Sequence, residues 1–294
     1  MKHQPLDRQV VVVTGASSGI GLSTALLAAE RGARVVLLAR SIGVLDQVAA
    51  TIGEDGGEAM ACGVDVANRS DVDAALARIM ERFGRIDTWI NNAGVSIYGR
   101  LDQVSDEDSR RLFDVNFWGV VHGSLAALPF LRQQAGALIN LGSEVSDAVL
   151  PLQGMYSASK HAVKGFTDAL RIEEAHVADS RVSVVLVQPT AVDTPYPRHA
   201  CNYLDGEPRL PAPLIAPERV AGAILHAAEH GGRDVTVGAM SMLNTTLSRW
   251  VPRLADRMAA LQLDRQQAEG PVRERGGALH RPSHGGRIHG DGPR

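Results

Sequence analysis

The feature that most constrains the fold is a strand, glycine turn and helix at the start of the chain. Four consecutive valines, Val10–Val13, form a β-branched run typical of a buried strand. The run leads into the turn TGASSGIG at 14–21, and an apolar-periodic helix is predicted from Leu22 to about Arg31. Such a unit offers backbone N–H groups and a helix N-terminus to a phosphate. The glycines alone would fit a simple tight turn equally well.

Strand-like and helix-like segments then alternate along the chain. Further strands are predicted at 34–39, 59–64, 88–90, 137–141, 181–187 and 234–237. Further helices are predicted at 44–52, 72–83, 106–134, 156–178 and 218–230. This alternation predicts an α/β fold with a doubly wound, mostly parallel, Rossmann-like sheet covered by helices on both faces. Pro129 is expected to kink or end the helix in which it lies.

Composition bounds the domain organisation. The chain has 294 residues, of which 45% are hydrophobic and 21% charged, and this suits one large domain, expected over residues 1–240. Residues 241–265 are expected to form a C-terminal amphipathic helix. Residues 266–294 are rich in Gly, Arg and His, and a disordered tail is expected there.

The C-terminal helix admits two interpretations. With Trp250 and the arginines at 249, 253 and 257, it could bind a membrane surface or a protein partner. It could also pack as a cover over the mouth of a substrate site.

Several function classes are disfavoured. A net charge of −3 gives no reason to expect a nucleic-acid partner. The two cysteines, Cys62 and Cys201, form neither a disulfide framework nor a metal cluster, and they fit a reducing compartment. The first nine residues are polar, and no apolar run is long enough for a membrane span. We therefore expect a cytoplasmic protein without a membrane span.

The end of the second strand bears on the choice of nucleotide. A dinucleotide fold that prefers NAD has an acidic residue here, which binds the ribose 2′-hydroxyl. This chain has Ala39 followed by Arg40, and a guanidinium can grip a 2′-phosphate bidentately. The alternative is a surface arginine at a strand end. The pattern favours NADP(H).

Two further turns follow strands. Asp65 follows the strand 59–64 and could hydrogen-bond an adenine amino group or cap the next helix. The run Asn91-Asn92-Ala93-Gly94 follows the strand 88–90, and its small residues let the backbone approach a ligand closely. An Asn-rich run of this kind is also common in ordinary turns.

Tyr156 and Lys160 are the candidate catalytic pair. At a spacing of four they lie one turn apart on one helix face. A nearby ammonium favours the phenolate, so we expect Lys160 to lower the Tyr156 pKa toward the range useful for a general acid/base. A Tyr–Lys pair at this spacing is also common on a solvated helix face. Asn116 lies within an apolar stretch and needs partners if buried, and Ser143 follows the strand 137–141.

Taken together, these motifs resemble the short-chain dehydrogenase/reductase family over about residues 8–240. The resemblance is carried by Thr14-Gly15-x-x-x-Gly19-x-Gly21, Asn91-Asn92-Ala93-Gly94, Asn116, Ser143 and Tyr156-x-x-x-Lys160. It implies that Tyr156 exchanges a proton with the substrate oxygen and that Ser143 hydrogen-bonds that oxygen. It implies that Lys160 lowers the Tyr156 pKa and holds the nicotinamide ribose, while Asn116 supports a water chain to Lys160.

The expected cofactor contacts combine the resemblance with the strand-end residues. They are Gly15, Ser17, Ser18, Gly19, Ile20, Gly21, Arg40, Asp65, Val66, Asn92, Ala93, Gly94, Tyr156, Lys160, Pro189 and Thr194. Two positions depart from the family pattern: Thr190 stands where glycine usually follows the proline, and Glu144 follows Ser143 where a small residue is commoner. Neither departure removes a catalytic group.

The sequence therefore predicts an NADP(H)-dependent oxidoreductase that interconverts a carbonyl and a secondary alcohol on a small-molecule substrate. The alternative from another class is a non-catalytic NADP(H) sensor or scaffold on the same fold. The complete set Asn116, Ser143, Tyr156 and Lys160 favours catalysis. Surplus apolar residues on the helices 106–134 and 156–178 favour a homodimer or homotetramer; they are Phe113, Phe117, Trp118, Val163 and Phe166. The alternative is that these side chains pack wholly within one subunit.

Overall fold

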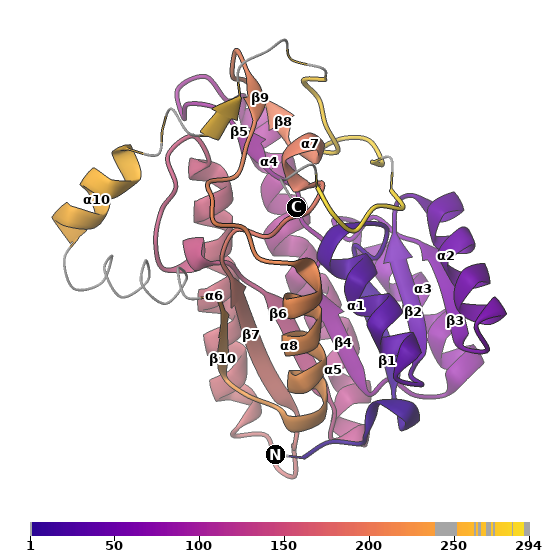
Figure 1. The fold of residues 1–294 in the computed structure, drawn as a ribbon. Helices are drawn as coiled ribbons and strands as arrows, with labels where there is room; N and C mark the ends of the chain where they lie inside the picture. The colour runs from indigo at the N-terminus through magenta and orange to yellow at the C-terminus, as the bar shows by residue number, and fades with distance from the viewer. Residues whose placement is uncertain are drawn as a thin grey trace.

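A seven-stranded sheet, parallel throughout, forms the centre of the molecule (Figure 1). The computed structural model describes residues 2–238, 252–261, 263, 266–268, 272, 274–283 and 285–290. In spatial order the strands are β10 (Asp234–Val237), β7 (Ser183–Pro189), β6 (Ala137–Leu141), β4 (Thr88–Asn91), β1 (Val10–Thr14), β2 (Arg34–Ala39) and β3 (Glu58–Gly63). The order reverses between β1 and β4, which makes their carboxyl ends the switch point where ligands bind in such sheets. The predicted fold class is confirmed.

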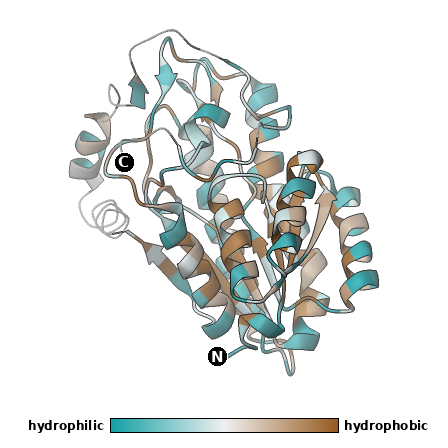
Figure 2. Cartoon of the chain, turned by 45° about the vertical axis from the view of Figure 1, so that its right-hand side comes forward, coloured by the Kyte–Doolittle hydropathy of each residue, from teal (hydrophilic) through white to brown (hydrophobic). Residues whose placement is uncertain are grey.

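Helices cover both faces of the sheet. One face carries α1 (Gly19–Glu30), α2 (Ile42–Glu54) and α8 (Pro217–His230). The other carries α3 (Arg69–Phe83), α4 (Asp106–Phe113), α5 (Gly119–Gln134) and α6 (Gly154–Glu174). Apolar residues gather on the strands and on the helix sides that face them, while polar residues lie outward (Figure 2).

The strand β1 shows why this arrangement needs an uninterrupted apolar run. Val10 and Val12 pack into the core on one face, and Val11 and Val13 pack into the core on the other. All four are fully buried, because successive side chains of a strand point to opposite faces and both are covered by helices.

Short elements surround the carboxyl edge of the sheet. Two small sheets pair β5 (Ile97–Tyr98) with β8 (Cys201–Asn202) and β9 (Glu207–Pro208) with β11 (Gln267–Ala268). Short helical turns occur at Glu144–Ser146 and α7 (Tyr196–His199), whereas the turn Leu6–Arg8 precedes β1 at the opposite, amino edge of the sheet. Except for Leu6–Arg8, these elements lie above the carboxyl ends of the strands (Figure 1), and β8, β9 and α7 belong to the stretch 195–217, which contains six prolines and is called the proline-rich stretch below.

Three predicted helices differ from those observed. The segment 106–134 is interrupted by a π-helical turn at Asp114–Trp118, and Pro129 does not end α5, which continues to Gln134. The helix that carries Tyr156 begins at Gly154 and ends at Glu174 rather than near 178. Of the predicted C-terminal helix, α10 (Pro252–Ala260) is described, whereas Arg249 and Trp250 lie outside the described residues.

The C-terminal segment, defined here as the described residues 274–283 and 285–290, differs from the expected disorder. Its backbone forms hydrogen bonds with the body of the domain, including Ala278 N to His199 O and Gly286 N to Ser17 O. In Figure 1 this yellow segment runs beside α7 and over the start of α1. Composition predicted disorder because the segment has few core formers, yet its contacts are made largely by backbone groups.

Within the described residues, both cysteines are buried and unpaired, and no helix is long and apolar enough to cross a bilayer.

We predict that Asp87→Ala destabilises the sheet. The buried Asp87 carboxylate accepts a hydrogen bond from Val10 N at 2.8 Å and pairs with Arg85 Nη2 at 2.6 Å. Removing it leaves a buried strand N–H and a guanidinium without this partner, which should lower the free energy of unfolding by about 3 kcal/mol. Asp102→Ala is the matched control, because Asp102 pairs with Arg100 at the same spacing on an exposed loop. Urea unfolding should shift for Asp87→Ala alone, and equal midpoints for the two variants would refute the assignment.

Candidate active site

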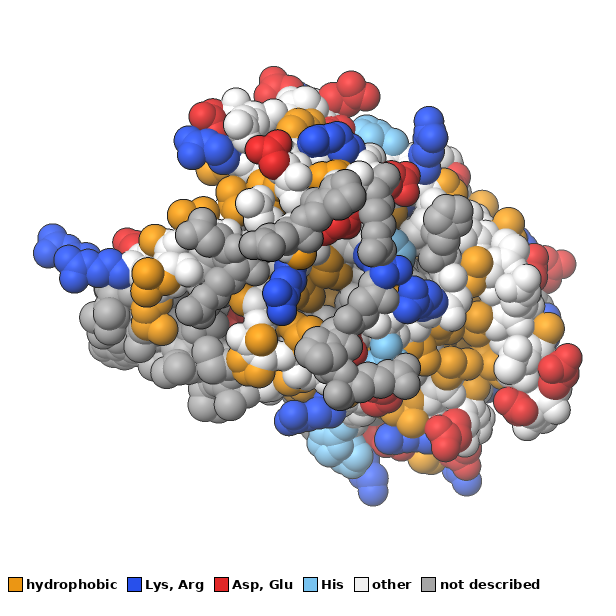
Figure 3. Space-filling model, turned by 45° about the horizontal axis from the view of Figure 1, so that its top comes forward, with side chains coloured by type: hydrophobic (Ala, Val, Ile, Leu, Met, Phe, Trp, Pro, Cys, Tyr) orange, Lys and Arg blue, Asp and Glu red, His pale blue; other side chains and the backbone are white. Residues whose placement is uncertain are grey.

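A cavity of about 250 Å³ opens at the carboxyl ends of β1 and β4. Its walls come from the glycine turn, the ends of β2, β3, β4, β6 and β7, and the start of α6. Figure 3 shows this face hollowed, with hydrophobic side chains inside the hollow and Lys or Arg side chains near its rim. The cavity therefore lies at the switch point that the strand order defines.

The glycine turn fits a closely approaching ligand. Gly15 and Gly19 have φ angles of +67° and +55°, which side chains rarely adopt. A Cβ on Gly21 would lie 2.3 Å from Gly15 O and 2.4 Å from Asn92 Nδ2. Gly21 therefore lets α1 pack against the turn rather than lining the cavity, while Ser17, Ser18 and the helix start face it. The turn, with the N-terminus of α1 behind it, has the character of a phosphate cradle.

Thr14 ties this turn to the next loop. Its Oγ1 accepts hydrogen bonds from Asn92 N at 2.9 Å and Ala93 N at 3.0 Å. In return, Asn92 Nδ2 donates to Thr14 O at 2.9 Å and to Gly15 O at 3.3 Å. The two walls of the cavity are thus held together by a reciprocal set of hydrogen bonds.

Arg40 and Asp65 both line the cavity, at the ends of β2 and β3. The Arg40 guanidinium donates from Nη1 to Leu279 O at 3.2 Å and from Nη2 to Ala278 O. Burial lowers the pKa of Arg40 from its usual value. Asp65 pairs with Arg111 Nη2 at 2.5 Å, and α3 is capped by Asn68, whose side chain accepts from Ser70 N. The helix-cap interpretation of Asp65 is therefore wrong.

Tyr156, Lys160 and Ser143 converge on the far part of the cavity. Hydrogen bonds link the Tyr156 hydroxyl with those of Ser143 and Tyr196. Lys160 Nζ lies 5.7 Å from the centre of the Tyr156 ring and donates to Leu141 O at 2.7 Å. An ammonium has three donors, so this contact leaves others for a ligand and for the tyrosine.

The electrostatics of this pair differ from the expectation. Burial raises the pKa of Tyr156, against the hydrogen bonds from Tyr196 and Ser143, and the Glu144 carboxylate raises it further. Burial also lowers the pKa of Lys160 to about 8. Desolvation is therefore the main cause, it acts against the expected lowering of the Tyr156 pKa, and the phenol stays protonated at neutral pH.

Asn116 lies within the π-helical turn between α4 and α5 and is fully buried. Its Oδ1 accepts from Val95 N at 2.8 Å, and its Nδ2 donates to Val95 O at 3.0 Å and to Ser159 Oγ at 3.1 Å. Ser159 in turn donates to Tyr156 O at 2.7 Å. Asn116 thus connects the β4 loop to the helix that carries the Tyr–Lys pair.

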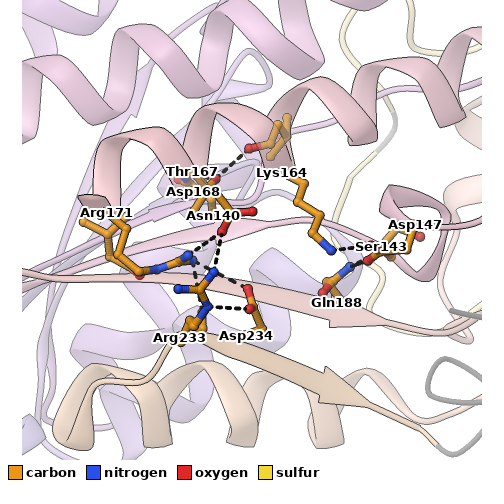
Figure 4. A network of polar contacts seen from close by, with 12 residues as sticks. Asn140, Ser143, Asp147, Lys164, Thr167, Asp168, Arg171, Gln188, Arg233 and Asp234 are labelled. Atoms are coloured by element: carbon orange, nitrogen blue, oxygen red, sulfur yellow. Dashed lines mark hydrogen bonds and ion pairs between the residues drawn. The ribbon is translucent and has the colours of Figure 1, made fainter. Parts of the chain in front are cut away.

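The loop of Ser143 is held in place by a polar network (Figure 4). Gln188 Nε2 donates to Ser143 O at 3.3 Å and to Asp147 Oδ2 at 2.7 Å, and Lys164 of α6 pairs with Asp147. The two positions that depart from the family pattern also meet, because Thr190 Oγ1 donates to Glu144 Oε2 at 3.2 Å.

Of the predicted site residues, all but Gly21 and Asn116 line the cavity. Sequence reasoning missed further polar residues that do so, among them Ser96, Gln153 and Tyr196. Tyr196 Oη donates to Gln153 Oε1 at 3.2 Å and its ring lies 5.5 Å from that of Tyr156. Tyr196 lies in the proline-rich stretch, and the only sequence signal for a role was the length of that stretch, because a long loop in a compact domain is usually functional or disordered.

A parallel sheet with this switch point, glycine turn and cavity defines a dinucleotide-binding α/β protein. A family model described as short chain dehydrogenase matches residues 9–201. "Uncharacterized oxidoreductase YxnA" of Bacillus subtilis (strain 168) is 42% identical over 279 residues, covering 94% of this chain and 78% of the relative. The chain belongs to the short-chain dehydrogenase family of oxidoreductases.

Two solved structures agree. A short chain dehydrogenase from Burkholderia cenocepacia J2315 in complex with NADP has 28% identity and a TM-score of 0.73, covering 87% of this chain and 99% of that one. A short chain dehydrogenase/reductase from Burkholderia phymatum in complex with NAD has a TM-score of 0.77, covering 92% of this chain and all of that one. At 24% identity, the second shows the fold alone.

Proposed function

We propose that this protein is an NADP(H)-dependent oxidoreductase that interconverts a carbonyl and a secondary alcohol, with Tyr156 as general acid/base. One observation carries the proposal. Hydrogen-bonded Ser143 and Tyr156 hydroxyls face the same cavity as the glycine turn, with the Lys160 ammonium beside them. Family membership and the NADP complex of a relative support it.

The side chains divide the work at the substrate oxygen. A bound nicotinamide supplies or accepts the hydride at the carbon. Ser143 and Tyr156 place two hydroxyl donors where negative charge develops on the oxygen during carbonyl reduction. Tyr156 transfers its proton to that oxygen, and its raised pKa keeps the proton available at neutral pH. Lys160 holds positive charge near the phenolate that remains.

The cofactor preference rests on Arg40. The β2 end offers no carboxylate to a ribose 2′-hydroxyl, because Ala39 and Arg40 stand there. A guanidinium fork at this place suits a 2′-phosphate.

The sensor alternative requires no proton transfer, so the loss of the Tyr156 hydroxyl distinguishes the two functions.

We predict that Tyr156→Phe lowers turnover by roughly 10² or more, the usual effect of a placed proton donor. Cofactor affinity should stay near that of the wild type, since the ring still packs and Lys160 is unchanged. Turnover is measured by nicotinamide absorbance with a panel of ketones and alcohols, and cofactor affinity is measured by fluorescence titration. Tyr98→Phe is the control, because Tyr98 is buried outside the cavity lining.

The pH profile is the second readout for Tyr156. Because the pKa is raised, the protonated form persists to high pH. The rate of carbonyl reduction should stay constant through neutral pH and fall only at the high pH where the phenol ionises. The rate of alcohol oxidation should rise over the same high-pH range.

Turnover of Tyr156→Phe above about a tenth of the wild-type value, against the 10² loss expected of a proton donor, would favour the sensor.

We predict that Arg40→Ala weakens NADP(H) binding by roughly 10- to 150-fold, the worth of a charge-assisted hydrogen bond. NAD(H) binding should change little, because NAD(H) lacks the 2′-phosphate. Arg34→Ala is the matched control, since Arg34 begins the same strand at its opposite end. Titration of each variant with both cofactors tests this, and equal wild-type affinities for NADP(H) and NAD(H) would contradict it.

We also propose that the protein is a homodimer or homotetramer formed through α5 and α6. Val163 is buried and Phe166 partly buried in the subunit, as the alternative interpretation requires. Trp118 and Leu125, however, are 49% and 45% exposed at positions seven residues apart. We predict a dimeric or tetrameric mass by light scattering at micromolar concentration, reduced by Leu125→Glu but not by Leu101→Glu. A monomeric wild type would refute the proposal.

A further inference from the structure

Two arginines from different elements point at one oxygen beside the cavity. Arg40 Nη1 lies 3.2 Å from Leu279 O, and Arg111 Nε of α4 lies 3.3 Å from the same atom. Asp65 pairs with Arg111, so the two arginines and this carboxylate together carry a net charge of about +1. Arg111 does not belong to any motif that the sequence pattern identified.

The group that these cations hold is neutral. The Arg40 fork takes the carbonyls of Ala278 and Leu279, both buried residues of the C-terminal segment. A guanidinium binds a phosphate more strongly than a neutral carbonyl, because both partners are then charged. The cationic site is therefore better matched to an anion than to the carbonyls that fill it.

The same segment contacts two other residues that line the cavity, Gly19 and Ser41. Gly19 N, at the start of α1, donates to Arg287 O at 2.9 Å, and Ser41 Oγ donates to Ser283 O at 3.0 Å. The segment thus binds a helix N-terminus of the kind that binds phosphate as well as the arginine fork.

We propose that Arg40 and Arg111 form one anion site that takes either the 2′-phosphate of NADP(H) or the carbonyls of Ala278 and Leu279, so that the C-terminal segment competes with the cofactor. Arg111 is then a second specificity-determining residue. The competition multiplies the association constant for NADP(H) by the fraction of molecules in which the segment is displaced, so the apparent affinity is lower wherever the segment stays bound. This inference rests on the proposed NADP(H) function and extends it.

Neighbouring glycines provide a matched pair of variants in the full chain. A Cβ on Gly277, whose φ is +50°, would lie 2.4 Å from Ala200 O and 2.5 Å from His199 O. A Cβ on Gly276 would meet nothing within 4 Å. Gly277→Ala should therefore dislodge the segment while leaving the glycine turn, Arg40 and Arg111 unchanged, and Gly276→Ala should leave the segment in place.

Calorimetric titration with adenosine 2′,5′-bisphosphate tests the competition, because this probe carries the 2′-phosphate without the nicotinamide. We predict that Gly277→Ala binds it roughly tenfold more tightly than the wild type, as removal of a competing conformer requires, while Gly276→Ala does not. Adding Arg111→Ala to Gly277→Ala should weaken binding by roughly tenfold, and adding Arg110→Ala should not. Weaker or unchanged binding by Gly277→Ala would overturn the proposal.

Hydrogen exchange on the wild type gives an answer that does not depend on the variants. Exchange at the amides of Ala278 and Gly286 should rise when adenosine 2′,5′-bisphosphate is added and change less with 5′-AMP. Slower exchange would mean that the segment closes over the nucleotide, which overturns competition. If the wild type and Gly277→Ala each bind adenosine 2′,5′-bisphosphate and 5′-AMP with equal affinity, the NADP(H) preference itself fails. If the preference is present but Gly277→Ala leaves it unchanged, only the competition fails.

Discussion

The site depends on the hydrogen bonds between the glycine turn and the loop after β4. Thr14 and Asn92 form hydrogen bonds with each other's backbone groups across the switch point, where the strand order reverses between β1 and β4. Without that link the turn would have exposed polar groups and no fixed distance from the opposite wall. Since the helix of Tyr156 and Lys160 is tied to the same loop through Asn116, the glycine turn and the Tyr–Lys pair share one frame.

The sequence predicted the structural features that follow from residue type and from the regular spacing of residues along a strand or helix. Val10–Val13 required a strand covered on both faces, and Tyr156 and Lys160 had to share a helix face. The π-helical turn at Asn116 was missed, because one extra residue in a helix leaves no compositional mark. The C-terminal segment was missed for a related reason. Its contacts with Arg40, Ser41 and Gly19 use backbone carbonyls, which every residue carries.

The pKa of Tyr156 shows a further limit of sequence reasoning. Spacing identified the charged neighbour but could not supply the depth of burial, and burial determines the direction here. Glu144, which departs from the family pattern, acts in the same direction as burial and is hydrogen-bonded by Thr190, the other departure. The two unusual residues thus form one contact beside the Ser143 and Tyr156 hydroxyls rather than two independent changes.

The π-helical turn also affects how this helix can change. It contains one residue more than an α-helical path would need, and each residue of an α-helix turns the chain by about 100°. Deleting a single residue from the turn would therefore return the chain to a regular α-helix, and the later side chains of α5 would keep their directions toward the sheet. Only the side chains of the turn itself, Asn116 among them, would move. The position of Asn116 thus depends on the extra residue, whereas the packing of α5 does not.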